Sequence, residues 1–245
     1  ANYSAGDRIT YALSLINTGT AAITDYTVTD NLGGYTVGAN TVYPLAYNAG
    51  TVRYYINGVL QTAPTVTAGP PLTVTGLTVP AGGSAVLIYE TTATPVAPLA
   101  TGSSITNTAT ITGGGLTTPI TAQATVETAN SADLTISKAL SPTTVTENGQ
   151  ITYTFVISNT GNTEATATGN VVVTDTFAPI LRNIAVTYNG TAWTEGTNYT
   201  YNAATGIFTT LAGQITVPAA TFTQNTDGTF TVTPGTATLV ISGTV

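Results

Sequence analysis

The chain has 245 residues, a net charge of −7, only 4 Lys and Arg together, and no Cys, His or Met. Without imidazole or thiol groups, it has no zinc finger, no disulfide framework and no His- or Cys-based catalytic centre. Because cations are so few, and because no apolar run approaches the ~18–20 residues of a membrane span, we expect no nucleic-acid partner, no membrane insertion and no cofactor.

Short runs rich in Val, Ile and Thr, separated by Gly and Pro, predict an all-β chain. In chain order, the clearest predicted strands are residues 8–16, 26–30, 52–56, 85–89, 105–112, 134–140, 151–158, 171–177, 184–188, 230–232 and 238–242. The pairs Asn57-Gly58 and Asn189-Gly190 are hairpin signals, because both turn positions need a positive φ. Strands this short, at this spacing, predict antiparallel sandwiches.

The two halves of the chain repeat each other. Residues 9–11 and 17–19 (Ile-Thr-Tyr and Asn-Thr-Gly) return unchanged 142 positions later as residues 151–153 and 159–161. Val28-Thr29-Asp30 likewise returns as Val173-Thr174-Asp175, and Pro80-Ala81-Gly82 is similar to Pro234-Gly235. The sequence therefore predicts two Ig-like sandwiches in tandem, residues 1–130 and 131–245, joined in the polar stretch 127–132.

The repeat is out of phase with the chain ends. The second half opens with a strand at residues 132–138 that has no counterpart before Gly6, and the first half closes with residues 105–110, which have none before Val245. We therefore predict that the first sandwich lacks its first strand and that the second lacks its last.

Several segments are similar to a known family; they read ADLTISK, GQITYTFVISNTG, VVVTDTF and ITNTATIT. They resemble the tandem Ig-like conserved-repeat domains of bacterial surface proteins, a domain family of unknown function, and the related isopeptide-forming shaft domains of Gram-positive fimbriae. The resemblance covers nearly the whole chain, twice. It implies an Ig-like fold, a location on the bacterial cell or spore surface, and a part in stalks, fimbrial shafts, adhesin arms or appendages.

Four polar side chains are candidates for chemistry. Lys138 is the only lysine, and the alternation of its strand places it on the apolar face. The same alternation places Asp30, Asp175 and Asn107 on the apolar faces of their strands. Such side chains seldom lie unpaired in a core, so the four are predicted to form a cross-link site.

One reaction uses these groups. A desolvated, neutral Lys amine can attack the carboxamide carbon of Asn and expel ammonia, while a protonated carboxyl group polarises the amide. The fimbrial families form this isopeptide bond between a first-strand Lys and a last-strand Asn. The resemblance implies those roles for Lys138 and Asn107, with Asp30 and Asp175 as the carboxyl groups. The departure from the family is that Lys138 and Asn107 belong to different predicted domains.

Each candidate also has a purely structural interpretation. Lys138 can extend to the rim of the sandwich and pair with an acid. Asp30 and Asp175, at strand ends, can accept backbone N–H bonds from the turns that follow them. Asn107 can satisfy the backbone of an adjacent loop.

The leading hypothesis is a non-enzymatic structural subunit of an extracellular filament, fimbria or spore or cell-surface appendage. The missing strands would come either from sequence adjacent to residues 1–245 or from a neighbouring subunit. In the second case subunits join head to tail by strand complementation, and the few charges leave the sheet edges open to such pairing. The alternative is an adhesin or carbohydrate-binding module, whose aromatic patch would lie around Tyr54 and Tyr55 or around Trp193, Tyr199 and Tyr201. An enzyme is disfavoured, because only a perturbed Asp or Glu could serve as a base near neutral pH.

Overall fold

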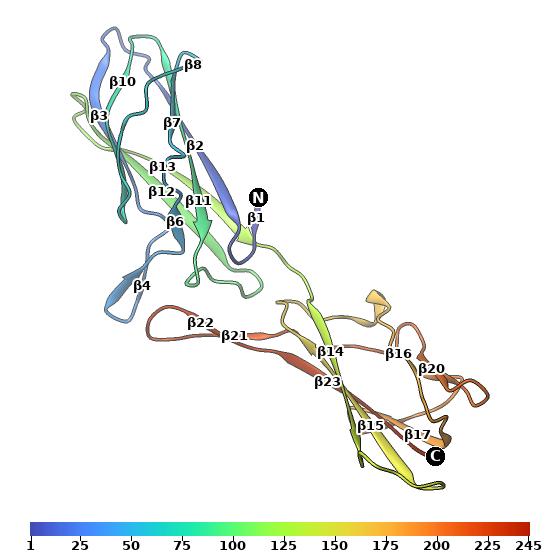
Figure 1. Ribbon diagram of the computed structural model, residues 1–245. Coiled ribbons are helices and arrows are strands. Elements are labelled where there is room, and N and C mark those ends of the chain that lie inside the picture. Colours follow the sequence, from blue (N-terminus) through green and yellow to red (C-terminus); the bar gives the residue numbers. More distant parts are fainter. The chain divides into compact units, whose positions relative to one another are not determined.

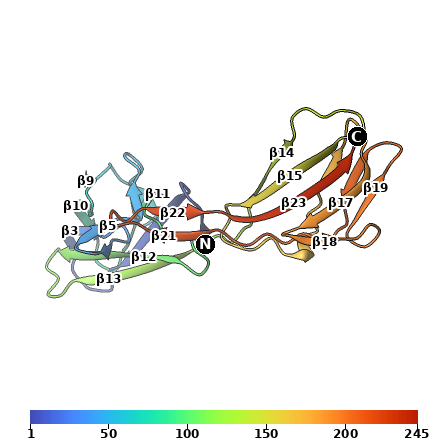
Figure 2. The same cartoon turned by 90° about the horizontal axis from the view of Figure 1, so that it is seen from below.

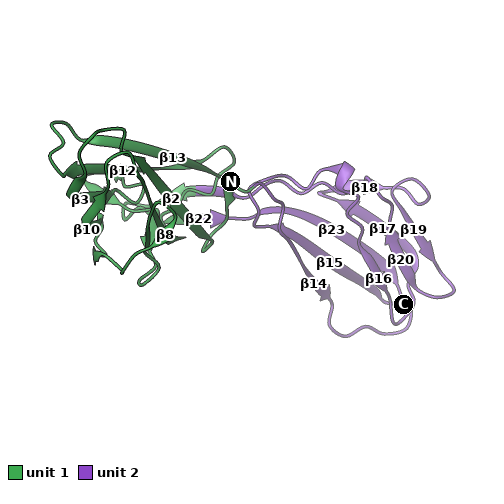
Figure 3. Cartoon of the chain, turned by 90° about the horizontal axis from the view of Figure 1, so that it is seen from above, with its two compact units in different colours: residues 1–129, 223–231 green, residues 130–222, 232–245 purple.

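A computed structural model describes all residues, 1–245, as an all-β chain, which confirms the predicted fold class (Figure 1). The chain forms two compact units (Figure 3). Unit 1 comprises residues 1–129 and 223–231, and unit 2 comprises residues 130–222 and 232–245. The only helical segment is a single 3-10 turn, Ala167–Gly169, so no helix could cross a bilayer.

Unit 1 is built from two main sheets and one hairpin. Its strands are β1 (Asn2–Tyr3), β2 (Arg8–Ile16), β3 (Ile23–Asp30), β4 (Tyr35–Val37), β5 (Asn40–Val42), β6 (Leu45–Tyr47), β7 (Arg53–Ile56), β8 (Val59–Leu60), β9 (Thr65–Thr67), β10 (Leu72–Val79), β11 (Ser84–Ala93), β12 (Ser104–Gly113) and β13 (Ile120–Thr128). The larger sheet has the order β1-β13-β12-β3-β10-β9, and the second has β2-β11-β7-β8 with β6 also on β11. Strands β4 and β5 pair with each other.

Unit 2 has the same plan with fewer strands. Its strands are β14 (Leu134–Ser141), β15 (Gln150–Asn159), β16 (Thr174–Thr176), β17 (Arg182–Tyr188), β18 (Thr191–Trp193), β19 (Tyr199–Asn202), β20 (Ile207–Thr210) and β23 (Gly235–Thr244). Figure 2 shows β14, β15 and β23 side by side in a sheet of order β14-β15-β23-β17-β18, while the other sheet is β16-β20-β19. The hairpin β21–β22 (Thr221–Gln224, Phe230–Thr233) forms a sheet of its own.

Both predicted Asn-Gly hairpins are present. Asn57-Gly58 joins β7 to β8, with φ of 48° and 80°, and Asn189-Gly190 joins β17 to β18, with φ of 48° and 79°. The predicted strand at 171–177 is wrong in length, since only Thr174–Thr176 pairs. Val173 N donates instead to Thr210 Oγ1, and β16 has a ladder partner on one side only.

The internal repeat is visible in individual hydrogen bonds. Asn17 Nδ2 donates to the carbonyls of Ala21 and Pro80, and its Oδ1 accepts from the N–H of Gly19. Asn159 makes the same three bonds one repeat later, to Thr163 O, Pro218 O and Gly161 N. Both amides are buried and close the same loop in each unit. By this geometry the counterpart of Pro80 is Pro218, which corrects the predicted match with Pro234.

Each unit has its own hydrophobic core. That of unit 1 is formed from both main sheets and includes Tyr3, Tyr26, Leu72, Leu77, Tyr89, Ile105 and Ile111. That of unit 2 includes Tyr153, Phe155, Phe177, Leu181, Phe208, Ile215 and Leu239. Burial of such side chains is worth roughly 1.5–3 kcal/mol each, so each core can stabilise its own unit.

The two units differ in which strands are missing at one edge. In unit 1, β3 pairs with both β10 and β12, and β12 pairs with β13, whereas β2 pairs with β11 alone. In unit 2, β2's repeat counterpart β15 has the extra partner β14, whereas β16, the counterpart of β3, pairs with β20 alone. Within residues 130–245, unit 2 therefore contains no counterpart of β12 or β13.

Each unit consequently exposes part of a core-facing surface. We call the side chains of Ile120, Ala122 and Ala124, which share the parity of buried Val126, the β13 face. We call Ile136, Lys138 and Leu140 the β14 face. Ile120 is 42% exposed, Ile136 54% and Leu140 42%.

Candidate functional site

In unit 1, two of the predicted site residues meet in the core. Asp30 ends β3 and Asn107 lies on β12, and both side chains are buried. Asn107 Nδ2 donates to Asp30 Oδ2 over 2.9 Å, and Asn107 Oδ1 accepts from the N–H of Gly33 over 3.1 Å. Asp30 Oδ1 accepts from the N–H of Leu32 over 2.7 Å. The structural roles foreseen for these two residues, accepting from the following turn and satisfying a loop, are therefore present.

Two tyrosines that the sequence did not single out complete this cluster. Tyr89 on β11 donates its hydroxyl to Asp30 Oδ2, and its ring stacks on that of Tyr11 on β2, with centroids 5.7 Å apart. Tyr11 is also buried, yet its hydroxyl has no hydrogen-bond partner. Such an unpaired buried group carries a desolvation penalty of about 1–3 kcal/mol. The polarity of the cluster is therefore not fully satisfied within one chain.

Burial dominates the electrostatics of the cluster. Loss of solvent raises the pKa of Asp30, and the bonds from Tyr89, Leu32 and Asn107 offset only part of that rise. Burial, with the nearby Asp30 charge, also raises the pKa of the Tyr11 and Tyr89 phenols. Both phenols stay protonated around neutral pH and remain hydrogen-bond donors.

A cavity of about 60 Å³ opens onto this cluster. Its lining combines the four polar residues with small side chains from β12 and β13, and comprises Tyr11, Ala12, Leu13, Asp30, Tyr89, Asn107, Ala109, Ala122, Gln123 and Ala124. A single water needs only about 10–15 Å³ of such space, so the cavity has room for a larger polar group. It lies between the free edge of β2 and the β13 face.

In unit 2, the other two predicted residues form an ion pair. Lys138 Nζ on β14 lies 2.5 Å from Asp175 Oδ2 on β16. It also lies 4.7 Å from the centre of the Tyr153 ring and 5.6 Å from that of Phe177, both buried aromatics. The predicted direction of the side chain, toward the core residues, is therefore correct.

The burial expected for Lys138 is wrong, because its side chain is 40% exposed. Every β14 residue after Leu134 is exposed as well. Alternation determines which way a side chain points, but only an opposing strand covers it, and β16 is the last strand of the opposing sheet. The rim ion pair expected as the structural alternative is what the unit contains.

The four residues thus form two pairs, Asp30 with Asn107 in unit 1 and Lys138 with Asp175 in unit 2. Each pair is half of the set that amide formation needs. Unit 1 has the amide and a carboxyl group without an amine, and unit 2 has the amine and a carboxyl group without an amide. The sequence patterns of β2 and β11 place Tyr11 and Tyr89 on the inner faces, which is the signal that could have identified them.

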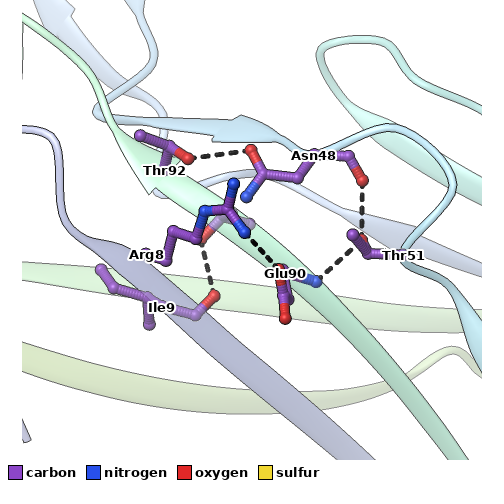
Figure 4. Close-up of polar contacts among 7 residues, drawn as sticks. Arg8, Ile9, Asn48, Thr51, Glu90 and Thr92 are labelled. Carbon is purple, nitrogen blue, oxygen red and sulfur yellow. Dashed lines mark hydrogen bonds and ion pairs between the residues drawn. The ribbon is translucent and has the colours of Figure 1, made fainter.

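A second polar cluster, drawn in Figure 4, ties a loop to β11 on unit 1. Thr92 Oγ1 donates to Asn48 Oδ1, Thr51 Oγ1 donates to Asn48 O and accepts from the N–H of Glu90, and Arg8 lies 3.7 Å from Glu90. Most of its groups bond one another. The cluster is therefore a structural brace. No group of three or more acidic side chains is arranged to hold a metal.

Most of the aromatic residues predicted for a carbohydrate-binding face take part in packing. Tyr54 and Tyr199 are core residues, and the hydroxyl of Tyr54 bonds Tyr26 and the carbonyl of Thr78. Trp193 stacks on Tyr188 at 4.7 Å, and Tyr201 donates to the carbonyl of Leu181. These four rings are used for packing, and Tyr55 is half-buried.

No family model and no curated protein matches the sequence. Among solved structures, the chain is similar to the major pilin subunit BcpA of Bacillus cereus, at 12% identity and a TM-score of 0.32, over 96% of this chain and 61% of that one. It is also similar to the pilus backbone RrgB of Streptococcus pneumoniae, at 13% identity and 0.36, over 95% and 49%. The group B streptococcus pilus 2b backbone protein matches at 16% identity and 0.38, over 86% and 76%. The chain spans about half to three-fifths of the first two proteins, and at this similarity none of the three assigns it to a family.

Proposed function

We propose that the chain is a structural subunit of an extracellular bacterial filament or surface appendage, in which copies join head to tail by strand complementation. One observation carries the proposal: each unit leaves a core-facing surface and a strand edge open, and the open parts belong to different strands in the two units. An edge with free N–H and C=O groups recruits another strand, and a contact between two different surfaces propagates without closing. Nothing in either polar cluster suggests turnover of an external substrate.

We further propose that the joint can become covalent between Lys138 and Asn107. The Lys138 amine attacks Cγ of Asn107, a new C–N bond forms, the C–NH₂ bond breaks, and one ammonia leaves with the displaced proton. Asp30 Oδ2 accepts from Asn107 Nδ2, so Asp30, whose pKa burial raises, can carry a proton to the departing nitrogen, while the N–H of Gly33 polarises the carbonyl.

Electron microscopy of the purified protein, followed by mass analysis of the same sample after denaturation, tests both points. We expect ordered fibres and a ladder of oligomers in which each bond lowers the mass by about 17 Da, the mass of ammonia. The variant Lys138→Arg keeps the positive charge but has no nucleophilic amine, so it should form fibres that dissolve to monomers of full mass.

Different outcomes would contradict the filament and the cross-link. Dispersed monomers at every concentration tested contradict the filament. Fibres whose denatured subunits have the full uncondensed mass contradict the cross-link and leave the filament standing.

A further inference from the structure

We propose that the two open faces are partners: the β14 face of one copy seats on the β13 face of a second copy, with the Lys138 ammonium in the cavity beside Asp30. This inference rests on the proposed head-to-tail assembly and names the surfaces that make it. The occupant of the unit 1 cavity is thus a second copy of this chain, joined without any covalent step.

The two faces are complementary in size. The β13 face carries small side chains, Ala122 and Ala124, beyond buried Val126. The β14 face carries Ile136 and Leu140 on either side of Lys138. Large apolar side chains from one copy would fill the space left by the alanines of the other, and both sets are exposed to water in the single chain.

The polar groups are complementary as well. Asp175 occupies one of the three N–H donors of the Lys138 ammonium, which leaves two for a partner. The cavity presents the Asp30 carboxylate, the carbonyl oxygen of Asn107 and the hydroxyl of Tyr11, which has no partner within the chain. An ammonium entering here would satisfy that buried hydroxyl.

The internal repeat shows that unit 1 already has the surroundings of a lysine. In unit 2, Lys138 Nζ lies over the Tyr153 ring and against Asp175. The repeat counterparts of those two residues are Tyr11 and Asp30, and both line the cavity. Unit 1 therefore reproduces the environment of Lys138 without containing a lysine in it.

The strand edges also agree with this seating. β14 ends its sheet in unit 2, and β2 ends the corresponding sheet in unit 1. With the β14 face on the β13 face, the free edge of β14 comes beside that of β2. The part of the β13 edge that β1 leaves unpaired, before Glu127, comes beside the free edge of β16. The two half-covered sandwiches would thus overlap and cover each other's open faces. Neither β13 nor β14 would have to leave its own unit.

Two blocked variants test the joint on the whole chain. Ala122→Arg with Ala124→Arg fills the receiving face, and Ile136→Asp with Leu140→Asp removes the apolar donor face. All four positions are exposed, so both variants should fold, as circular dichroism can verify. Each variant alone lacks one of the two faces in every copy and should stay monomeric. Mixed, they should form a 1:1 dimer that grows no further, as read by analytical ultracentrifugation.

Matched single changes locate Lys138 in that dimer. Lys138→Ala added to the receiver-blocked variant should weaken the dimer at least tenfold, whereas the same change in the donor-blocked variant should leave its dissociation constant unchanged. Tyr11→Phe in the donor-blocked variant should weaken the dimer without lowering the melting temperature of the monomer, because the hydroxyl has no partner there.

Three outcomes separate this joint from the proposed function. Fibres from the wild type with no dimer from the mixture would overturn the joint and leave the filament intact. A Lys138-dependent dimer with no wild-type fibres would uphold the joint and remove the filament. Equal loss from Lys138→Ala in either variant would overturn the joint.

Discussion

Asp30 and Asp175 occupy the same repeat position and are satisfied by different partners. Tyr89 lies opposite Tyr11 in the β11–β2 ladder, and Ile241 lies opposite Tyr153 in the β23–β15 ladder, so Ile241 is the counterpart of Tyr89. Unit 1 therefore has a phenol to donate to its Asp, and unit 2 does not. The ammonium of Lys138 takes the place of that donor, which is why one Asp is buried and the other lies at an open rim.

The buried Asp30 should make the stability of unit 1 depend on pH. Because burial raises its pKa above the ordinary 3.8, the folded chain holds this proton more tightly than the unfolded chain does. The contribution of Asp30 to the free energy of unfolding is complete below pH 3.8. It is lost as pH rises through the raised pKa of Asp30 in the folded chain. The free energy of unfolding of the wild type should therefore fall, relative to that of Asp30→Asn, as pH rises through this window.

Urea unfolding at a series of pH values measures that difference. Asp7→Asn is the matched control, because the Asp7 side chain is exposed whereas that of Asp30 is buried. Curves for the wild type and Asp30→Asn that run parallel across the acid range would show that Asp30 is not linked to folding.

Strand β14 is held by its backbone far more than by its side chains. It pairs with β15 along its full length, from Leu134 opposite Asn159 to Ser141 opposite Thr152, yet one of its faces contacts little. Its neighbour β15 alternates regularly between buried and half-buried positions. Two strands of similar composition thus lie in very different environments, because only β15 has an opposing sheet.

This contrast can be measured on one cross-strand pair. Ile136 and Ile157 lie directly opposite each other, with Ile136 54% exposed and Ile157 3% exposed. In the monomer, Ile157→Thr should lower the free energy of unfolding by about 2–4 kcal/mol, because it removes buried carbon and adds a hydroxyl. Ile136→Thr should change it by less than about 0.5 kcal/mol. Similar losses from both changes, in denaturant titrations below the assembly concentration, would mean that the β14 face is covered.

The whole chain contains two separate cores, and the same buried Asn closes a loop at the edge of each. Asn17 serves unit 1 and Asn159 serves unit 2. Trp193, the only Trp, stacks on Tyr188 within unit 2. Its fluorescence therefore reports on one unit, whereas the β-sheet signal in circular dichroism reports on both.

Substitution of either Asn should act on its own unit. Asn159→Ala removes the partner of two carbonyls and of two N–H groups, those of Gly161 and Asp133. This should cost on the order of 2–4 kcal/mol and lower the midpoint of the Trp193 transition. Asn17→Ala should leave that midpoint in place and lower a transition seen only by circular dichroism. A Trp193 midpoint that moves equally with both changes would indicate one cooperative unit.

Sequence periodicity was sufficient to predict the long strands with regular alternation. It failed for strands with irregular or weakly apolar sequences, and it could not predict which side chains contact each other. The predicted strand at residues 8–16 is β2 exactly as paired, whereas β10 was missed because Gly76 interrupts its alternation and prolines precede it. β13 was missed because two of its central inner positions, Ala122 and Ala124, give little apolar contrast. Strand alternation correctly predicted that Asp30 and Asn107 face the core. It could not predict that they contact each other, since cross-strand register is set by tertiary packing.

The order of strands in unit 2 has a mechanical consequence. β14 and β23 flank β15 and run antiparallel to it, so they run parallel to each other, with Leu134 and Gly235 at one end of the sheet and Thr244 at the other. A pull on residue 130 and on Val245 in opposite directions would therefore slide these strands lengthwise, and would load the hydrogen bonds of both ladders together rather than one after another. Tension between these two points of unit 2 would be carried in shear, the direction in which a sheet resists rupture best.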